Sequence, residues 1–174
     1  MKSTSKRRSI RDGNDHIDHS DDQLKLAGFH IGGALYGIDI MRIKEVIQAA
    51  PYKVRPVPNA PNLVEGVIQL RGVVIPIIDL RKRFGATIDP ELNSLNKLIV
   101  VSVRGRIAGL KVDRVVGELR VSVGELRPAP SILKVETESI PEFFSGVCRI
   151  GDEMVFVVNL EGVVDNHSRN PAHA

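Results

Sequence analysis

Sulfur and aromatic side chains are scarce in this sequence. Its 174 residues include one cysteine, no tryptophan, two tyrosines and five phenylalanines. A single cysteine cannot form an internal disulfide bond, which argues against a small disulfide-stabilised secreted domain and favours a reducing compartment. The few aromatic rings also leave little for a surface that stacks the bases of a single-stranded nucleic acid.

Long apolar runs and catalytic motifs are absent as well. The densest apolar stretches, VVIPII and LIVV, are too short for a signal peptide or a membrane-spanning helix. The spacings typical of phosphate loops, zinc proteases, serine hydrolases and paired zinc cysteines do not occur. We therefore expect a cytoplasmic protein that is not inserted in a membrane, and the missing motifs disfavour an enzyme and a cofactor or metal site.

Basic charge is slightly in excess, but it is spread out. The formal charge is +3 and the pI is near 9.2. Residues 1–22 carry five basic and five acidic side chains, and residues 23–165 carry 18 basic and 16 acidic ones. Only Arg81, Lys82 and Arg83 form a cluster, which is either the solvated face of a helical turn or a partner contact. A small RNA-binding barrel, whose affinity would fall steeply with salt, stays open as an alternative.

The pattern of apolar segments predicts an all-β protein. Residues 1–22 are almost free of apolar side chains, so we expect a disordered charged tail, and residues 166–174 are expected to form a flexible C-terminal tail. In between, short segments rich in Val and Ile are separated by turn residues. Strands are predicted at Leu24–Ile31, Ala34–Ile38, Glu65–Leu70, Val73–Asp79, Lys97–Val103, Ile107–Val112, Val115–Val121, Gly146–Ile150 and Met154–Leu160.

The body of the chain contains an internal duplication. GVIQLRGVVIPIIDL from Gly66 aligns without a gap on GVCRIGDEMVFVVNL from Gly146, at a spacing of 80 residues. YGIDIMRIKEV from Tyr36 aligns on AGLKVDRVVGE from Ala108, at a spacing of 72. Residues 23–165 are therefore expected to form one domain of two similar, intertwined halves. A residue that the fold requires should recur in both halves, whereas one that serves only function can appear once.

Turn and capping residues predict four hairpins and two short helical turns. Tight turns are expected at Gly32-Gly33, Arg71-Gly72, Arg104-Gly105 and Gly151-Asp152, because glycine reaches positive backbone angles easily. Asp39 can cap a turn over Met41–Lys44, and Asp79 can cap one over Leu80–Phe84 that ends at Gly85. Pro76 lies inside a strand-like run and predicts an edge or a bulge there.

Two proline-containing segments are expected to be extended connections. They are Lys53–Pro61 and Arg127–Pro130. The pair Pro58 and Pro61 also has the spacing of a polyproline ligand for SH3-like grooves, but prolines that end strands are common in small β domains. We favour a stiff interstrand loop.

Residues with reactive side chains are few. His16 and His19 fall in the charged tail, where a polar tail is favoured over a metal site. His30 has no partner suggested by the sequence and is expected to end a strand. Cys148 stands opposite the apolar Ile68 of the other half, which favours a buried thiol over a nucleophile. An enzyme that uses Cys148 is the remaining catalytic alternative.

Arg71 and Glu45 are the polar residues for which the duplication suggests a function. Arg71 falls on a predicted turn, and Gly151 stands at its counterpart. Glu45 stands opposite Gly117 in the same way. Because the duplicate turn forms without an arginine, recognition is favoured over an incidental surface charge, and arginine is frequent at protein contacts.

At these residues the sequence closely resembles the CheW family, the coupling proteins of bacterial chemotaxis. The matching segments are FHIGGALYGIDIMRIKEVI, PNLVEGVIQLRGVVIPIIDLRKRFG, AGLKVDRVVGELRVSVGELRPAP and FFSGVCRIGDEMVFVVNLEGVV. The resemblance implies two five-stranded SH3-like barrels packed face to face. It also implies a non-catalytic adaptor, monomeric alone, that binds the regulatory domain of the histidine kinase CheA and the tips of methyl-accepting chemoreceptors. Through these partners it would join receptor arrays.

The same resemblance assigns roles to seven positions. It implies receptor contact at Ile43, Glu45 and Arg71, with the last two as an ion pair; a kinase-facing side at Val46 and Val73; and glycines sensitive for coupling at Gly66 and Gly109. The chain departs from the family where Gln69 replaces a frequent Asn, Leu63 a frequent aromatic residue and Glu65 a frequent Lys. These departures imply a different preference for partners.

Overall fold

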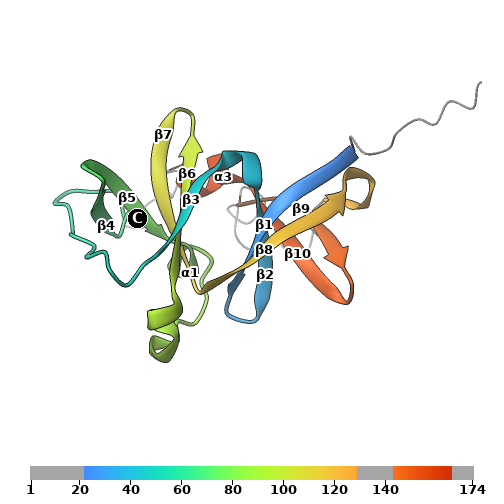
Figure 1. Ribbon diagram of the computed structural model, residues 1–174, viewed down its shortest axis with the longest axis horizontal. Coiled ribbons are helices and arrows are strands. Elements are labelled where there is room, and N and C mark those ends of the chain that lie inside the picture. Colours follow the sequence, from blue (N-terminus) through green and yellow to red (C-terminus); the bar gives the residue numbers. More distant parts are fainter. Residues whose placement is uncertain (1–21, 129–142, 166–174) are drawn as a thin grey trace, which may run out of the picture.

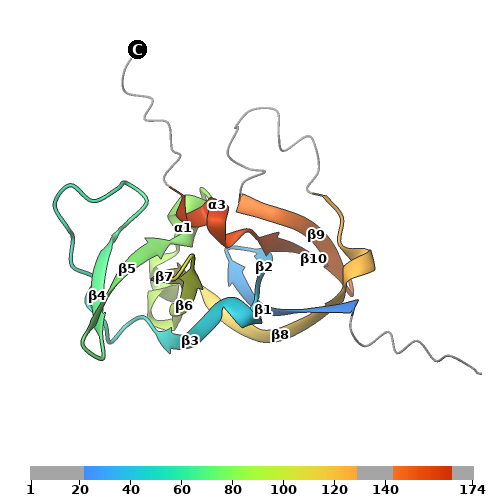
Figure 2. The ribbon, with the colours of Figure 1, turned by 90° about the horizontal axis from the view of Figure 1, so that it is seen from above.

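Figures 1 and 2 show a computed structural model of the protein, which describes residues 22–128 and 143–165. Apart from Asp22, the predicted tails at residues 1–22 and 166–174 lie outside this part of the chain, and so do His16 and His19. Among the described residues, no helix is long and apolar enough to cross a membrane.

Two five-stranded sheets make up the described part of the chain, each curled into a small SH3-like barrel (Figure 1). One sheet has the order β8 (Arg114–Ser122), β1 (Gln23–Ile31), β2 (Ala34–Asp39), β10 (Glu153–Val158), β9 (Phe144–Ile150). The other has the order β3 (Ile43–Gln48), β6 (Lys97–Val103), β7 (Arg106–Val112), β5 (Val73–Asp79), β4 (Gly66–Leu70). We call the first the terminal barrel and the second the central barrel. The predicted all-β fold is confirmed.

The two barrels exchange strands between the repeated halves. Strands β1–β5 form the first repeat and β6–β10 the second, and the two sheet orders become identical when each strand is replaced by its counterpart. The terminal barrel combines β1 and β2 with β8, β9 and β10, whereas the central barrel combines β3, β4 and β5 with β6 and β7. Neither repeat can therefore complete a barrel without the other.

Helices are short where the structure describes the chain. They are α1 (Leu80–Arg83), α3 (Leu160–Val164), and the 3-10 turns η2 (Ile40–Arg42), η3 (Pro90–Leu95) and η4 (Val123–Glu125). The predicted caps are confirmed: the carboxylate of Asp39 accepts from the Met41 backbone N–H, and that of Asp79 accepts from the Arg81 backbone N–H. All four predicted hairpins form between the expected strands.

One strand was not predicted. The helical turn expected over Met41–Lys44 ends at Arg42, and β3 begins at Ile43 on the edge of the central sheet. Its alternation of half-buried and exposed residues is typical of an edge strand, but Lys44 and Glu45 interrupt the apolar sequence. A bulge at Lys44 adds to the irregularity, and β8 has a bulge at the counterpart position.

Pro76 lies in a strand that is internal to the sheet. β5 stands between β7 and β4, so it is not an edge strand as a whole. Its ladder with β7 covers only Ile77–Asp79, however, and at Pro76 the strand pairs with β4 alone. A residue without a backbone N–H is tolerated there because one side of the strand is locally open.

The core has three parts. One cluster fills each barrel, and the largest lies between them, with Phe29 and Ile38 from the terminal barrel and Ile99 and Leu110 from the central one. Cys148 belongs to the terminal-barrel cluster and is 4% exposed. The prediction of a buried thiol is confirmed, and burial raises the pKa of Cys148, which keeps the thiol protonated.

The basic cluster at α1 is not a uniform solvated face. The side chain of Arg81 is 3% exposed, and its guanidinium donates two hydrogen bonds to the carboxylate of Asp79, at 3.0 and 2.9 Å. A third hydrogen bond reaches Asn93, and Asp113 lies 3.7 Å away. The expectation that all three basic residues are exposed was wrong for Arg81, because a partner carboxylate two residues earlier allows a charge to be buried.

Candidate receptor and kinase surface

The backbone at Arg71 favours glycine, yet an arginine stands there. Arg71 has a φ of 48° and Gly72 a φ of 80°, which form the tight turn between β4 and β5. The counterpart of Arg71 in the terminal barrel, Gly151, has a φ of 60°. Glycine adopts this left-handed conformation without the steric cost that a side chain brings. The structure therefore carries a residue at this turn that the turn itself does not require.

Arg71 and Glu45 form the ion pair that was predicted. The two guanidinium nitrogens donate to the two carboxylate oxygens of Glu45 at 2.5 and 2.9 Å, a bidentate geometry. The side chain of Arg71 is 72% exposed and that of Glu45 is 27% exposed. These hydrogen bonds lower the pKa of Glu45 and raise that of Arg71, so both stay charged near neutral pH. The pair fixes the guanidinium plane at the surface.

Exposed apolar side chains lie next to both members of the pair in the sequence. Val73 follows the Arg71–Gly72 turn and is 52% exposed, and Val74 is 64% exposed. Val46 follows Glu45 and is also exposed. Isolated exposed valines are common, but here they follow the two members of a fixed charge pair along β3 and β5 of one barrel. Val74 was not among the predicted site residues, and its counterpart Met154 is apolar and exposed too.

The predicted receptor residues do not all share one environment. Ile43 is half-buried and packs against the cluster between the barrels. Glu45 is half-buried and Val46 exposed, as expected for neighbours on opposite faces of β3. The structure thus brings Glu45 and Arg71 together, while Val46 faces the other way. That arrangement is compatible with two different partners at one strand.

Gly66 and Gly109 are closely packed, Gly66 against backbone atoms and Gly109 against the end of a side chain that can move. A Cβ added at Gly66 would lie 2.4 Å from the backbone oxygen of Arg55, and one at Gly109 would lie 2.6 Å from Cδ1 of Ile77. Their counterparts Gly146 and Gly37 meet neighbours at 2.8 Å. Since both glycines recur in the other repeat, they belong to the fold.

The close approach at Gly66 has a structural reason. Arg55 and Val67 exchange backbone hydrogen bonds of 2.8 and 2.9 Å, which join the proline-containing connection to β4. Arg127 and Val147 do the same in the other repeat, at 2.8 and 2.7 Å. The prediction that Lys53–Pro61 is an interstrand connection is confirmed, and of Arg127–Pro130 only the first two residues lie in the described part of the chain. A side chain at Gly66 would separate the connection from the strand that leads to Arg71.

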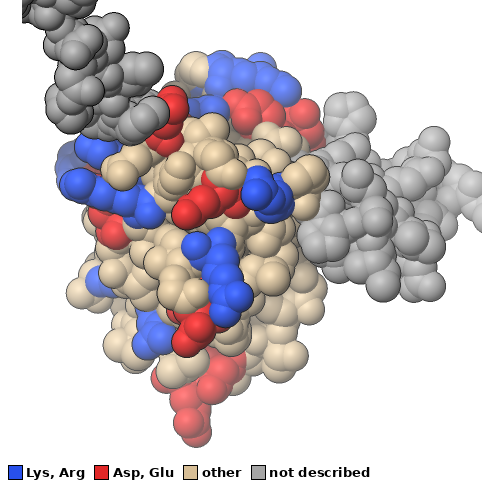
Figure 3. All heavy atoms as spheres, turned by 90° about the vertical axis from the view of Figure 1, so that its right-hand side faces the viewer, with Lys and Arg blue, Asp and Glu red and all other residues tan. Residues whose placement is uncertain are grey.

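Charges on the terminal barrel are interspersed. Figure 3 shows this end of the molecule, where basic and acidic side chains alternate among uncharged ones. Arg120 pairs with Glu118 and Arg149 with Asp152 on this barrel. A surface that binds a nucleic-acid backbone concentrates positive charge on one face. This face does not, which disfavours the RNA-binding alternative.

Comparison with known proteins identifies the family. The model of the CheW-like domain matches residues 25–168. The chain is 35% identical to the chemotaxis protein CheW of Treponema pallidum (strain Nichols), over 81% of this chain and 82% of that protein. It is 34% identical to the chemotaxis protein CheW of Rhizobium meliloti (strain 1021), over 85% and 92%.

A solved structure agrees with these relatives. The crystal structure of the scaffolding protein TtCheW from Thermoanaerobacter tengcongensis superposes with a TM-score of 0.71 at 30% identity, and the match covers 82% of this chain and 88% of that one. The family model, the relatives and this solved structure together define the class of the protein, which is that of coupling adaptors. The chain belongs to the CheW family.

Proposed function

We propose that this adaptor couples a methyl-accepting chemoreceptor to the histidine kinase CheA by binding both, without catalysing a reaction. The receptor tip contacts Ile43, Glu45 and Arg71, and the regulatory domain of the kinase contacts the side that carries Val46 and Val73. The names and scaffolding role of the relatives support this proposal. Through its partners the protein then works at cytoplasmic receptor arrays.

One observation supports the receptor surface above all others. The exposed, bidentate pair of Arg71 and Glu45 is confined to one repeat, while the other repeat has glycines at both positions. The counterpart turn between β9 and β10 forms without such a pair, so the turn itself does not require it. The pair presents unused N–H groups in a fixed orientation, so it can set the register of a partner while the neighbouring apolar side chains supply contact area.

Coupling requires that the receptor's states differ in how they contact this protein. A ligand shifts an equilibrium only by its differential affinity for the two states. Gly66 and Gly109 contribute by holding the strands in place, since β4 leads from Gly66 to the Arg71 turn and β7 places Gly109 against Ile77. A side chain at either glycine would displace this surface and weaken coupling without contacting a partner.

Charge reversal tests the receptor surface. Arg71→Glu should abolish receptor-dependent activation of the kinase and leave the melting temperature within about 3 °C of the parent, because an exposed pair adds little to stability. The measurement is kinase autophosphorylation in membranes with receptor, kinase and each variant. Arg149→Glu, which removes a comparable exposed pair from the terminal barrel, is the matched control and should behave like the parent protein.

A charge swap separates recognition from structure. The double variant Arg71→Glu with Glu45→Arg restores an ion pair but reverses its direction. If the pair only braces the turn, activation should return; if the guanidinium contacts the receptor, it should stay low. The proposal predicts no recovery, and full recovery in the double variant would contradict it.

A further inference from the structure

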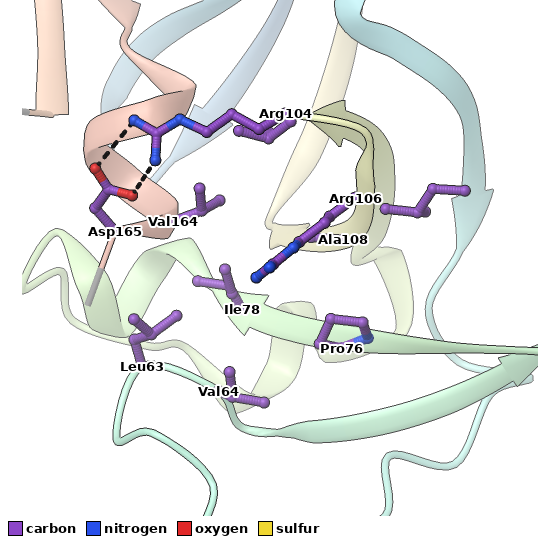
Figure 4. Close-up of a pocket in the computed structure, with 11 residues that line it drawn as sticks. Leu63, Val64, Pro76, Ile78, Arg104, Arg106, Ala108, Val164 and Asp165 are labelled. Atoms are coloured by element: carbon purple, nitrogen blue, oxygen red, sulfur yellow. Dashed lines mark hydrogen bonds and ion pairs between the residues drawn. The ribbon is translucent and has the colours of Figure 1, made fainter.

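An apolar pocket of about 430 Å³ lies on the outer face of the central barrel (Figure 4). Pro76 and Ile78 of β5 form its floor, Leu63 and Val64 approach from the segment before β4, and Val164 of α3 closes one side. The pocket lies toward the end of β5 that is remote from the Arg71–Gly72 turn. It is therefore separate from the surface assigned to the receptor.

The β6–β7 hairpin places two arginines beside the pocket. Arg104 pairs with Asp165 at 2.8 Å and so connects the hairpin to the end of α3. The guanidinium of Arg106 points into the pocket beside Ala108 (Figure 4). Within residues 22–128 and 143–165, no ion pair or side-chain hydrogen bond involves this guanidinium. An unpaired cation over an apolar floor is suited to a ligand that carries both a carboxylate and an apolar group.

The counterpart of this pocket beside the terminal barrel is filled with aromatic rings that come from both repeats. Five residues that line the pocket are small or aliphatic where their counterparts are aromatic: Leu63, Val64, Pro76, Ala108 and Val164 stand opposite Phe143, Phe144, Phe156, Tyr36 and Phe84. These rings pack on one another, with centroids of Phe84, Phe144 and Phe156 at 5.2, 5.9 and 5.7 Å from that of Tyr36. The pocket is thus the counterpart of an aromatic cluster from which the rings are missing.

The two arginines beside the pocket have no arginine counterparts beside the aromatic cluster. Arg104 and Arg106 stand opposite Gly32 and Ala34 in the other repeat. The same backbone arrangement therefore surrounds a cluster of packed aromatic rings beside the terminal barrel. In the central barrel it surrounds a cavity with a cation at its edge. Because the terminal barrel shows that aromatic rings fit this arrangement, an aromatic side chain from outside is the occupant that restores its packing.

We propose that the pocket docks a segment of a partner protein that inserts a Phe or Tyr side chain and sets a carboxylate against Arg106. The apolar surface continues outward along β5, since Val74, Pro76 and Ile78 alternate onto one face and Val74 is exposed. That row extends about 13 Å, roughly the length of two turns of helix. A chain segment covers it, whereas a small molecule would leave the outer part open.

Random-peptide display against the full chain tests this proposal without knowledge of the partner. The probe is a library of peptides long enough for two helical turns. Selected peptides should carry an aromatic residue and a nearby Asp or Glu. Leu63→Phe, which introduces the counterpart residue and fills the pocket, should weaken their binding about tenfold or more, and Arg106→Glu should do the same.

A variant on the terminal barrel provides the control for peptide binding, and Leu63→Phe provides the outcomes that would refute the proposal. Arg149→Glu on the terminal barrel should leave peptide binding unchanged, and the melting temperature of Leu63→Phe should not fall. Selected peptides without aromatic and acidic residues, or peptides that bind Leu63→Phe as well as the parent, would refute the proposal. Self-association that Leu63→Phe abolishes, measured by sedimentation, would also refute it in favour of a second copy as occupant. None of these results affects the proposed receptor surface, which is tested at Arg71.

Discussion

At the scale of single residues, the informative positions are those where the backbone conformation favours glycine but another residue is present. Arg71 and Arg104 both adopt left-handed angles, and their counterparts in the other repeat, Gly151 and Gly32, are glycines with similar angles. Both arginines use the side chain in an ion pair, with Glu45 and Asp165. At both turns the arginine therefore forms an ion pair although its backbone conformation has a steric cost.

The glycines of β4 and of the β1–β2 turn should respond differently to the same change. Gly66→Ala places a Cβ 2.4 Å from a backbone oxygen, so it should lower the free energy of unfolding by about 2 kcal/mol, measured in urea. Gly33→Ala is the matched control, because no atom lies within 4 Å of its added Cβ. It should change stability by less than about 0.5 kcal/mol. Equal effects would contradict the steric role of Gly66.

The buried pair of Asp79 and Arg81 should make stability depend on pH in the acid range. Burial alone would raise the pKa of Asp79, but hydrogen bonds and charge from Arg81 lower it below its usual value. A carboxyl whose pKa is lower when folded stabilises the protein above its unfolded pKa, and this contribution is lost as the pH falls through the folded pKa. Stability should therefore decrease below about pH 4.

Asp79→Asn tests that assignment. The variant leaves the Arg81 charge buried without its partner and should cost about 3 kcal/mol at pH 7, measured by urea denaturation. It should also be less sensitive to acid than the parent, since the titrating group is gone. A variant with unchanged stability at pH 7 and an unchanged acid response would show that the pair does not hold the α1 region.

At the scale of elements, sequence reasoning succeeded where local chemistry is strong. Turn glycines, the caps at Asp39 and Asp79, and runs of Val and Ile located nine of the ten strands in the described part of the chain. β3 could not be found in this way, because its edge position puts Lys44 and Glu45 within a strand. The burial of Arg81 also depended on contacts with η3 and Asp113, which are distant in sequence.

The candidate site, too, was predictable from the sequence only in part. The duplication singled out Arg71 and Glu45 as unmatched residues, and the resemblance to the CheW family predicted that they form an ion pair. The steric roles of Gly66 and Gly109 needed coordinates, since a sequence does not show which backbone approaches a glycine. The pocket was not predicted either. Its signal was present in the alignment of Ala108 with Tyr36 and of Pro76 with Phe156, but only packing shows that these positions meet.

At the scale of the whole molecule, the two halves of a duplicated fold carry different functional features. The strand orders of the two barrels are identical, and each barrel takes strands from both repeats, so the barrels unfold together or not at all. The repeats nevertheless differ at the surface around Arg71 and in the packing around the pocket. The Arg71–Glu45 pair and the apolar pocket both lie on the central barrel, which leaves the terminal barrel as their support.

The most direct test of the receptor surface is to map it on the intact protein. Amide chemical shifts of the full chain would be recorded while a soluble fragment of the receptor's hairpin tip is added. The account predicts that shifts change around Ile43, Glu45 and Arg71, whereas the counterpart turn at Gly151 and Asp152 stays unchanged. Shift changes at the Gly151 turn, with Arg71 and Glu45 unaffected, would contradict it.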